Sequence, residues 1–588
     1  MSSSGKPSFD TNLVRVYREA AVEVPSTATS SQLSAPGYYF DILVPVGDWV
    51  FPAIQHRRNT VEARPTVEAL PIDDIDLVNN LAVFWVDIFV PETAAGGIYE
   101  QTVVLDPFCD GPVDERANNI THDIAIEVTD TFTIPSTSSI ASNIEWSIDN
   151  ACRAHIPDRD SCWDAEKPGL SDLYGRFMLE HRLTITLDPG LSSSTPADQV
   201  DDYVSLAQPF VDGTVNFFEP NILPGAQMTS LRYPFPWKKG DADSRDRMVA
   251  WMSKIGSSPL NWDQKIPATF DKVGDEINPD PAFAGTEKDP DLAYERAQDA
   301  RNAGIPTLLT ASRKMVEDAR PELLADDLID PALNGEDLID TLVVNVTHLD
   351  HYSAPDYTGN QRDQYSEFMA AGNTVWSYQS CNSHGCSSPN GHPGELGDGK
   401  AWPTLVVDSW AVENRAEPWL AFLYGALGLQ GEGSYLKGIH YYDVMAWSDV
   451  LLAPSRDDSP FGGSDLYREG GQGEGILVYP GSPEHLGGSW HFPLASVRLK
   501  QIRAALEEIE WLLKCAANDA AEAEEIAAKL FSAMTDVTAD DVYLRYGGMY
   551  DIRNGRSEKE FAEDWRQARI RLWYCVDGND PSYTSFGG

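Results

Sequence analysis

Apolar and polar positions alternate along the first 135 residues with the two-residue period of β-strands. Proline and glycine separate the alternating runs, as turn residues separate strands, and no amphipathic helical pattern interrupts them. This pattern predicts a β-sandwich over residues 1–135. Its strands are expected at Tyr38–Val44, Leu81–Val90, Tyr99–Leu105 and Asp123–Phe132.

The pattern changes after Pro135, where strand-like runs begin to alternate with runs of helical period. About eight strand–helix repeats over residues 136–490 predict a (β/α)8 barrel of the TIM type. A doubly wound open sheet is the alternative for the same repeats. The strand-like runs are Ile144–Ile148, Leu183–Leu187, Val215–Phe218, Thr269–Val273, Thr307–Thr310, Leu342–Val346, Thr374–Tyr378 and Lys437–Tyr442. The helix-like runs include Arg245–Ile255, Leu292–Ala303, Gln364–Ala371 and Pro418–Leu427.

Helical periodicity dominates the C-terminal part, which we expect to form a helical extension over residues 491–588 packed on the barrel. Apolar residues spaced by three and four run from Leu499 to Leu513 and mark the packing face of one helix. Two further helices are expected at Ala520–Met534 and Glu558–Leu572.

The chain is strongly acidic, with 91 Asp and Glu residues against 44 Lys and Arg residues and a formal net charge of −47. Such a surface repels phosphate backbones and anionic lipids, so nucleic acid and membrane surfaces are not expected partners. The charge is typical of a protein that works in molar salt, where the Debye length is about 3 Å. We therefore expect a halophilic source; an ordinary acidic protein is the alternative.

No apolar run reaches the roughly 18 residues of a membrane span, and the first residues show neither a hydrophobic signal stretch nor a twin-arginine motif. The seven cysteines do not form a disulfide-scaffold pattern. Cys381 and Cys386 flank His384, and a loop disulfide or free thiols explain this motif better than a metal site with three ligands. No cofactor and no resident metal are expected.

The candidate chemistry starts at Asp275 and Glu276, which follow the strand-like run Thr269–Val273 and Gly274. In a (β/α)8 barrel the reactive groups lie on loops at the C-terminal ends of the strands. Neighbouring side chains in a regular strand point to opposite faces, so both carboxylates share a pocket only if the strand stops here. Gly274 and the prolines that follow at 279 and 281 indicate such a stop.

Other predicted strand ends supply aromatic and hydrogen-bonding side chains. Aromatic faces with polar groups between them suit a ligand that has both C–H faces and hydroxyls, which is the chemistry of a sugar. Trp376 could instead belong to the barrel core, and His348, Asp350 and His351 could instead hold a metal ion. The expected sugar-contacting residues are His348, Asp350, Trp376, Tyr378, Asp408, Arg415, Tyr441, Tyr442 and Trp447.

These blocks resemble glycoside hydrolase family 123, whose members include β-N-acetylgalactosaminidase-type enzymes. Gly274-Asp275-Glu276 resembles the catalytic Asp-Glu pair of that family. The segment from Val375 to Tyr378, together with Asp408 and Arg415, resembles its next conserved block. Further similar blocks are Phe84–Pro91, Ile126–Pro135, Gly473–Gly481 and Ser496–Leu499.

The resemblance implies that Glu276 acts first as the general acid and then as the base that activates water. It implies that Asp275 orients the 2-acetamido group of the sugar, whose carbonyl oxygen attacks C1 in place of an enzyme nucleophile. Asp275 would also favour the protonated form of Glu276 through like-charge proximity. This chain departs from the family pattern because Ile277 and Asn278 separate the pair from the following proline.

Two hypotheses of function follow. The first is a retaining, substrate-assisted glycosidase that acts on glycans containing N-acetylhexosamine. The second is a glycan-binding structural protein of a virion tail, built on a glycosidase scaffold without activity. Expected partners are a carbohydrate substrate or host surface glycan, and other virion proteins or further copies of the chain. Because no export signal is visible, the expected location is a virion or the cytoplasm of a halophile, where the enzyme would trim imported oligosaccharides.

Overall fold

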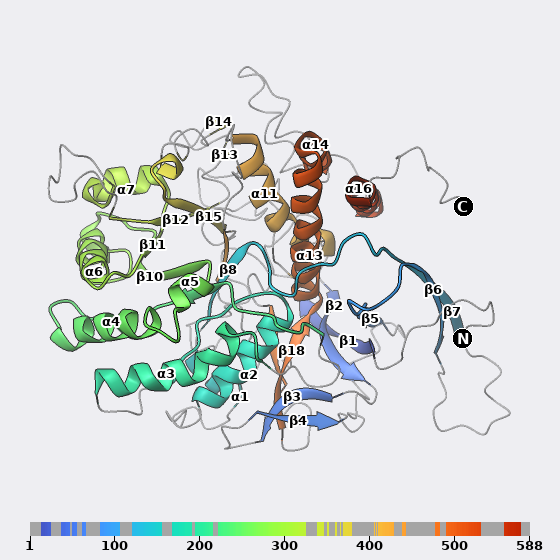
Figure 1. Ribbon diagram of the computed structural model, residues 1–588, viewed down its shortest axis with the longest axis horizontal. Coiled ribbons are helices and arrows are strands. Elements are labelled where there is room, and N and C mark those ends of the chain that lie inside the picture. The colour runs from blue at the N-terminus through green and yellow to red at the C-terminus, as the bar shows by residue number, and fades with distance from the viewer. Residues whose placement is uncertain are drawn as a thin grey trace.

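The computed structural model contains an antiparallel sheet, a curled parallel sheet and helices packed against both (Figure 1). It describes residues 13–24, 37–46, 50–55, 61–65, 83–105, 120–146, 148–155, 167–190, 195–215, 222–324, 338–345, 350–351, 359–360, 365, 368–378, 405, 407, 410–428, 438–442, 477–481, 490–530 and 558–577.

The antiparallel sheet has the strand order β4-β3-β18-β2-β1-β5, with β17 paired to β18. It combines N-terminal strands with two strands that come from residues 478–496, after the parallel sheet has been completed. The strands predicted at 38–44 and 81–90 are present as β2 and β5. The packing of two sheets face to face, which a β-sandwich requires, remains a prediction. The strands are β1 (Val14–Val24), β2 (Gly37–Val46), β3 (Val50–Gln55), β4 (Val61–Pro65), β5 (Phe84–Ile88), β17 (Val478–Gly481) and β18 (Trp490–Ser496).

A separate hairpin is formed by β6 (Gly97–Leu105) and β7 (Ile120–Val128), which pair with each other along their whole length. It extends away from the helices in Figure 1. Both strands match the runs predicted from the sequence, although β7 begins and ends a few residues earlier than expected.

The parallel sheet has the order β8-β16-β15-β12-β11-β10-β9. Six of the eight predicted strand-like runs contribute to it, and β11 and β15 coincide with their predicted bounds. The run predicted at 144–148 forms a strand only as far as Glu145, because Ile148 already begins a helix. The strands are β8 (Ala141–Glu145), β9 (Ser230–Arg232), β10 (Ala268–Asp275), β11 (Thr307–Thr310), β12 (Thr341–Asn345), β15 (Thr374–Tyr378) and β16 (Gly438–Tyr442).

The two edges of this sheet approach each other through the segment 183–187. Ile185 forms a parallel bridge with Ile144 of β8, and the Ile144 amide donates to the Thr184 carbonyl at 2.9 Å. On the other side, the Thr229 amide next to β9 donates to the Thr184 hydroxyl oxygen at 2.9 Å. The sheet is therefore strongly curled, and a complete eight-stranded barrel remains a prediction.

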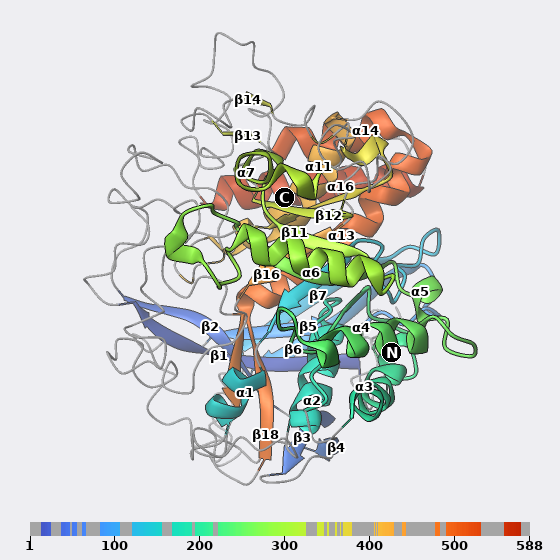
Figure 2. The same ribbon diagram turned by 90° about the vertical axis from the view of Figure 1, so that its left-hand side faces the viewer.

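Helices cover the parallel sheet, and Figure 2 shows α6 lying in front of β11 and β12. The predicted helices at 245–255, 292–303 and 418–427 correspond to α4, α6 and α11. In the described part of the chain, no helix has the combined length and apolar character that a membrane crossing requires. The helices are α1 (Ile148–His155), α2 (Lys167–Glu180), α3 (Pro196–Val211), α4 (Ala242–Ile255), α5 (Trp262–Lys265), α6 (Pro290–Asn302), α7 (Arg313–Ala319), α11 (Ala416–Gly428), α13 (Val497–Asn518), α14 (Ala520–Leu530) and α16 (Glu558–Asp577).

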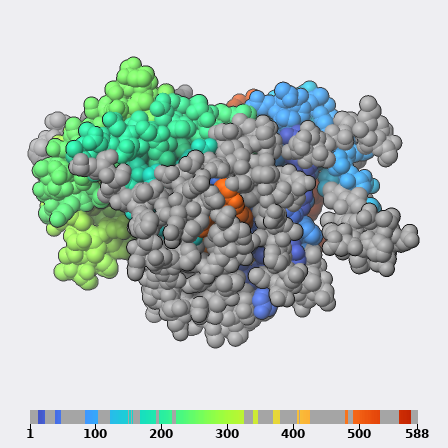
Figure 3. All heavy atoms as spheres, turned by 90° about the horizontal axis from the view of Figure 1, so that it is seen from below, coloured from blue at the N-terminus to red at the C-terminus, as the bar shows by residue number. Residues whose placement is uncertain are grey.

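Helix α13 follows β18 directly and joins the antiparallel sheet to the rest of the molecule. Its apolar stripe is buried, as the spacing from Leu499 to Leu513 predicts, except that Leu513 itself is only half-buried. In Figure 3, seen from below, an orange segment near residue 490 lies between the blue N-terminal strands and the green helical side. A disulfide that the sequence did not indicate joins Cys515 of α13 to Cys575 of α16.

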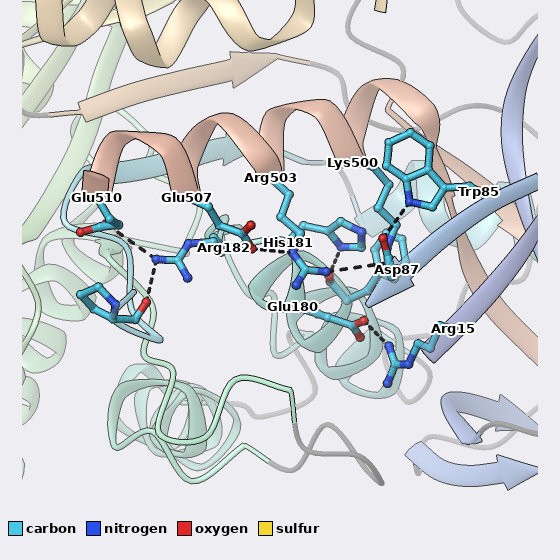
Figure 4. Close-up of polar contacts among 12 residues, drawn as sticks. Arg15, Trp85, Asp87, Glu180, His181, Arg182, Lys500, Arg503, Glu507 and Glu510 are labelled. Carbon is cyan, nitrogen blue, oxygen red and sulfur yellow. Dashed lines mark hydrogen bonds and ion pairs between the residues drawn. The ribbon is translucent and has the colours of Figure 1, made fainter. Parts of the chain in front are cut away.

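Charged side chains are buried where α13 meets the antiparallel sheet and α2 (Figure 4). Lys500 donates to Asp87 of β5 at 2.7 Å, and Arg15 of β1 pairs with Glu180 of α2. Arg182 lies 3.7 Å from Glu510. We call these residues, with Arg503, the buried charge cluster.

Candidate active site

Strand β10 ends in an irregularity that changes which side chains face the inside of the curled sheet. Its register against β11 shifts between Lys272 and Gly274, as in a β-bulge. Phe270 packs inside the sheet against Trp376, whereas Asp271 points outward to Arg296 of α6. Residues three apart in a regular strand point to opposite sides, but the bulge adds one residue between Lys272 and Asp275. Both side chains therefore point to the inside of the sheet, where they lie 3.5 Å apart.

Glycine is required within this bulge because the neighbouring elements approach its backbone closely. A Cβ at Gly274 would lie 3.0 Å from the Ala293 Cβ on α6 and 3.2 Å from the Glu287 carbonyl oxygen. That same carbonyl accepts a hydrogen bond from the Asp275 amide at 3.0 Å. The glycine therefore allows the loop after β10 to fold back onto the strand.

Glu276 follows with a left-handed backbone, φ +41°. Its amide donates to the Thr310 carbonyl at the end of β11 at 2.6 Å, which helps to hold this uncommon conformation in place. The strand thus stops at the pair, as Gly274 and the prolines predicted. The conformation re-aims the Glu276 side chain so that it does not continue the alternation of the strand.

Both oxygens of the Glu276 carboxylate accept hydrogen bonds. The Tyr378 hydroxyl of β15 donates to Oε1 at 2.7 Å, and Lys288 Nζ donates to Oε2 at 2.8 Å. Tyr378 is buried, with 2% of its surface exposed, while Lys288 lies on the solvent side. Burial raises the pKa of Tyr378 well above its ordinary value, and the charges of Glu276 and Asp275 raise it further.

Asp275 belongs to a chain of alternating charges inside the sheet. Lys272, buried on β10, lies 2.5 Å from Glu145 at the end of β8, and Arg232 of β9 lies 3.0 Å from Glu145. Burial lowers the pKa of Lys272, but the charges of Glu145 and Asp275 outweigh it and the net shift is upward. Lys272 therefore remains a cation beside Asp275.

The pair is open to solvent, because 23% of the side-chain surface of Asp275 and the same fraction of Glu276 is exposed. A carboxylate with one oxygen on a tyrosine hydroxyl and a solvent-facing side can exchange a proton with a bound molecule. A second carboxylate beside a lysine can accept a hydrogen bond or stabilise a positive charge. The arrangement suits acid–base chemistry on a polar ligand.

The structure brings some of the predicted residues together and separates others. Asp275, Glu276 and Tyr378 meet. Trp376 is 2% exposed and lies two residues before Tyr378 on the same face, edge-on to Phe270 at 5.6 Å, so its described contacts are those of the sheet interior. Arg415 lies in the 3₁₀ helix Ala411–Arg415 and binds Gln501 and Glu508 of α13.

Three predicted residues are placed by their backbone alone. Tyr441 and Tyr442 lie at the C-terminal end of β16, where they pair with Ile144 and Glu145 of β8. Asp350 lies in β13 (Asp350–His351), which pairs with β14 (Gly359–Asn360). His348, Asp408, Trp447, Cys381 and Cys386 lie outside the described residues. Among the residues that are described, no group of three or more His, Cys, Asp or Glu side chains is arranged to hold a metal ion.

Three charged residues near the pair were not predicted from the sequence, namely Glu145, Lys272 and Lys288. A signal for Lys272 existed, because Asp271-Lys272 places two charges in the middle of an otherwise apolar strand. Adjacent strand residues face opposite sides, so such a charge pair predicts one ion pair on each face. The position of Lys288, twelve residues after Glu276, depends on the loop fold and has no signal in the spacing.

The curled parallel sheet, its covering helices and the added antiparallel sheet form a fold that is similar to that of a solved glycoside hydrolase. A family 123 glycoside hydrolase from Clostridium perfringens, described for glycolipid glycan hydrolysis, aligns with a TM-score of 0.51 and 12% identity. The alignment covers 95% of this chain and 88% of that chain. At this identity the likeness shows the fold alone.

Two further solved structures align less well. A family 39 glycoside hydrolase from Bacteroides cellulosilyticus WH2 has a TM-score of 0.30 and 10% identity, covering 86% of this chain and 79% of that one. The xylanase 10B modules of Clostridium thermocellum have a TM-score of 0.27 and 8% identity, covering 85% and 84%. No protein-family model and no curated protein matches the sequence.

Proposed function

We propose that the protein is a glycoside hydrolase that acts on N-acetylhexosamine-containing glycans by a substrate-assisted, retaining mechanism. The observation that supports this proposal is the partly exposed Asp275–Glu276 pair at a bulge, in which Glu276, with its left-handed backbone, accepts a hydrogen bond from the Tyr378 hydroxyl. Glu276 is the proton donor to the glycosidic oxygen, and Asp275 orients the acetamido group.

The adjacency of the two acids favours substrate assistance over an enzyme nucleophile. Retaining glycosidases with their own nucleophile place the two carboxyls about 5–5.5 Å apart on either side of the scissile bond. Neighbouring residues held at the end of one strand do not flank a sugar in that way. Asp275 lies 3.5 Å from the Lys272 ammonium, and a carboxylate at this position suits the stabilisation of the positive charge that develops on the acetamido group during attack.

We further propose that the curled sheet is closed into a (β/α)8 barrel, with the segment 183–187 as the missing strand between β8 and β9. The hydrogen bonds of Thr184 to both neighbours support this closure. Closure would bring Glu145 and Arg232 to the same mouth as Asp275, in agreement with the ion pairs that Glu145 forms with Arg232 and with Lys272.

The test is hydrolysis of an aryl N-acetylhexosaminide in molar salt. We expect Glu276→Gln to lower kcat/KM by about 10²–10⁴-fold, the usual contribution of general acid–base catalysis. Asp275→Asn should reduce turnover of N-acetyl substrates more than turnover of the matching hexosides, and NMR of the first product should show retained anomeric configuration.

Glu295→Gln is the matched control, because Glu295 also pairs with a partly exposed lysine, Lys239, but lies on α6. It should leave turnover unchanged. Wild-type turnover in Glu276→Gln would contradict the catalytic assignment. Glycan binding without turnover by the wild-type protein would instead favour a binding protein on this scaffold.

A further inference from the structure

The loop after β10 closes onto its own start and so places Lys288 beside Glu276. Its first and last residues are joined by backbone hydrogen bonds from Asp275 to Glu287 at 3.0 Å and from Asn278 to Lys288 at 2.8 Å. Inside the loop, Asp280 caps the short 3₁₀ helix Pro281–Phe283, and Asp289 caps α6. Hydrogen bonds within the loop therefore hold the backbone of Lys288 in place.

The ammonium group of Lys288 is held less tightly than its backbone. It lies 2.8 Å from Glu276 Oε2 and 5.9 Å from the centre of the Phe283 ring, and 38% of its side-chain surface is exposed. A flexible lysine on the solvent side can leave its carboxylate when a ligand enters, whereas the buried Tyr378 on the other oxygen cannot.

In the part of the chain that the structure describes, the charged and titratable groups around Glu276 come from several elements. Lys288 comes from the loop and Tyr378 from β15, and Asp275 comes from β10 itself. Behind Asp275 lie Lys272, then Glu145 of β8 and Arg232 of β9. Among the described residues, Lys272 and Asp275 offset each other, and Lys288 is a cation that directly contacts Glu276.

We propose that Lys288 is a positioning residue that holds Glu276 ionised in the free protein and releases it for protonation when the substrate binds. The proposal rests on the proposed function of Glu276 as the general acid. An ammonium at hydrogen-bonding distance favours the carboxylate form. Glu276 must carry a proton on one oxygen to donate it to the leaving group, and Oε2 becomes available for that proton only when Lys288 moves away.

The consequence is a pH profile that depends on Lys288. The alkaline limb of kcat/KM reports loss of the proton from the general acid in the free enzyme. Without the cation this loss occurs at higher pH. A neighbouring opposite charge lowers the pKa of a carboxyl group by about 1–3 units. Because Lys288 is partly exposed, we expect a change near the lower end of this range.

The experiment compares Lys288→Met, Lys288→Arg and the control Lys239→Met, which removes a partly exposed lysine paired with Glu295. We expect the alkaline limb of Lys288→Met to move up by about one pH unit, which raises kcat/KM about tenfold above the wild-type limb. Lys288→Arg retains the positive charge, so its kcat/KM should fall at the same alkaline pH as that of the wild type. The same result is expected for Lys239→Met.

A second measurement needs no turnover. In protein labelled with ¹³C at glutamate carboxyls, the signal that is lost in Glu276→Gln should titrate about one pH unit higher in Lys288→Met than in the wild type. An unchanged midpoint in Lys288→Met, or equal shifts in the methionine and arginine variants, would overturn the inference. Turnover retained in Glu276→Gln would refute the proposed function, while the ¹³C titration would still decide the role of Lys288.

Discussion

Two carboxylates in this molecule have nearly the same partners but lie in different surroundings. Asp87 accepts hydrogen bonds from Lys500 Nζ at 2.7 Å and from the Trp85 indole at 2.7 Å. Glu276 accepts them from Lys288 Nζ at 2.8 Å and from the Tyr378 hydroxyl at 2.7 Å. The side chain of Lys500 is 2% exposed, whereas that of Lys288 is 38% exposed.

The surroundings decide what each pair can do. Burial raises the pKa of Asp87, but the charges of Lys500 and Arg503 outweigh it and keep the net value well below the ordinary range. Asp87 therefore stays ionised and holds α13 against the antiparallel sheet. The Glu276 pair has the same chemistry at the solvent boundary, where a ligand can replace the lysine. The partly exposed pair is therefore the better candidate for a functional site, and the buried pair is the better candidate for a structural role.

The largest expected effect comes from breaking the buried pair. Lys500→Met should lower the free energy of unfolding by about 3–5 kcal/mol, because it leaves Asp87 charged and poorly compensated in the interior. Lys288→Met should lower it by less than about 1 kcal/mol, because its pair is partly exposed. Urea unfolding of both variants measures the difference.

A double-mutant cycle sharpens this comparison. Lys500→Met combined with Asp87→Asn should be less destabilising than the sum of the two single changes, because the double variant leaves no unpaired buried charge. Additive losses would contradict the interpretation that the buried pair stabilises the fold through charge.

The next largest effect is expected from Glu19 in the antiparallel sheet, which should make the free energy of unfolding depend on pH. Burial, with the added charge of Asp41, raises the pKa of Glu19 from 4.5 to about 7. The folded state therefore binds the Glu19 proton more tightly than the unfolded state, and this contribution to stability is lost as the pH rises from about 4.5 to about 7. Because glutamine does not titrate, Glu19→Gln should avoid this loss, which amounts to about 3 kcal/mol in the free energy of unfolding.

Unfolding free energies between pH 4 and pH 9 check this prediction. The advantage of Glu19→Gln over the wild type should grow across the window and become constant above it. A difference between the two proteins that does not change with pH would contradict the shift.

A smaller effect than that of Glu19→Gln is expected at the bulge beside the site. Gly274→Ala should cost about 1–2 kcal/mol of stability through overpacking, since its Cβ would meet Ala293 and the Glu287 carbonyl. Movement of that carbonyl should displace Asp275, so kcat should fall while substrate binding changes little. Wild-type stability together with wild-type kcat would show that the close approach is not required.

The sequence alone determined the strands and helices whose patterns are local. β11 and β15 lie where alternation predicts them, and the apolar stripe of α13 is buried because its spacing follows the helical period. The sequence also located the Asp275–Glu276 pair, because a glycine and nearby prolines after a strand mark its end in the chain itself.

Only the tertiary structure decided which residues surround that pair. Strands β17 and β18 join the N-terminal sheet from more than four hundred residues away, and no local pattern contains that pairing. Arg415 contacts α13, while Lys272 reaches Glu145 across the curled sheet. Contacts of this kind depend on how strands are ordered and where a bulge shifts the register, and side-chain spacing along the chain does not encode those distances.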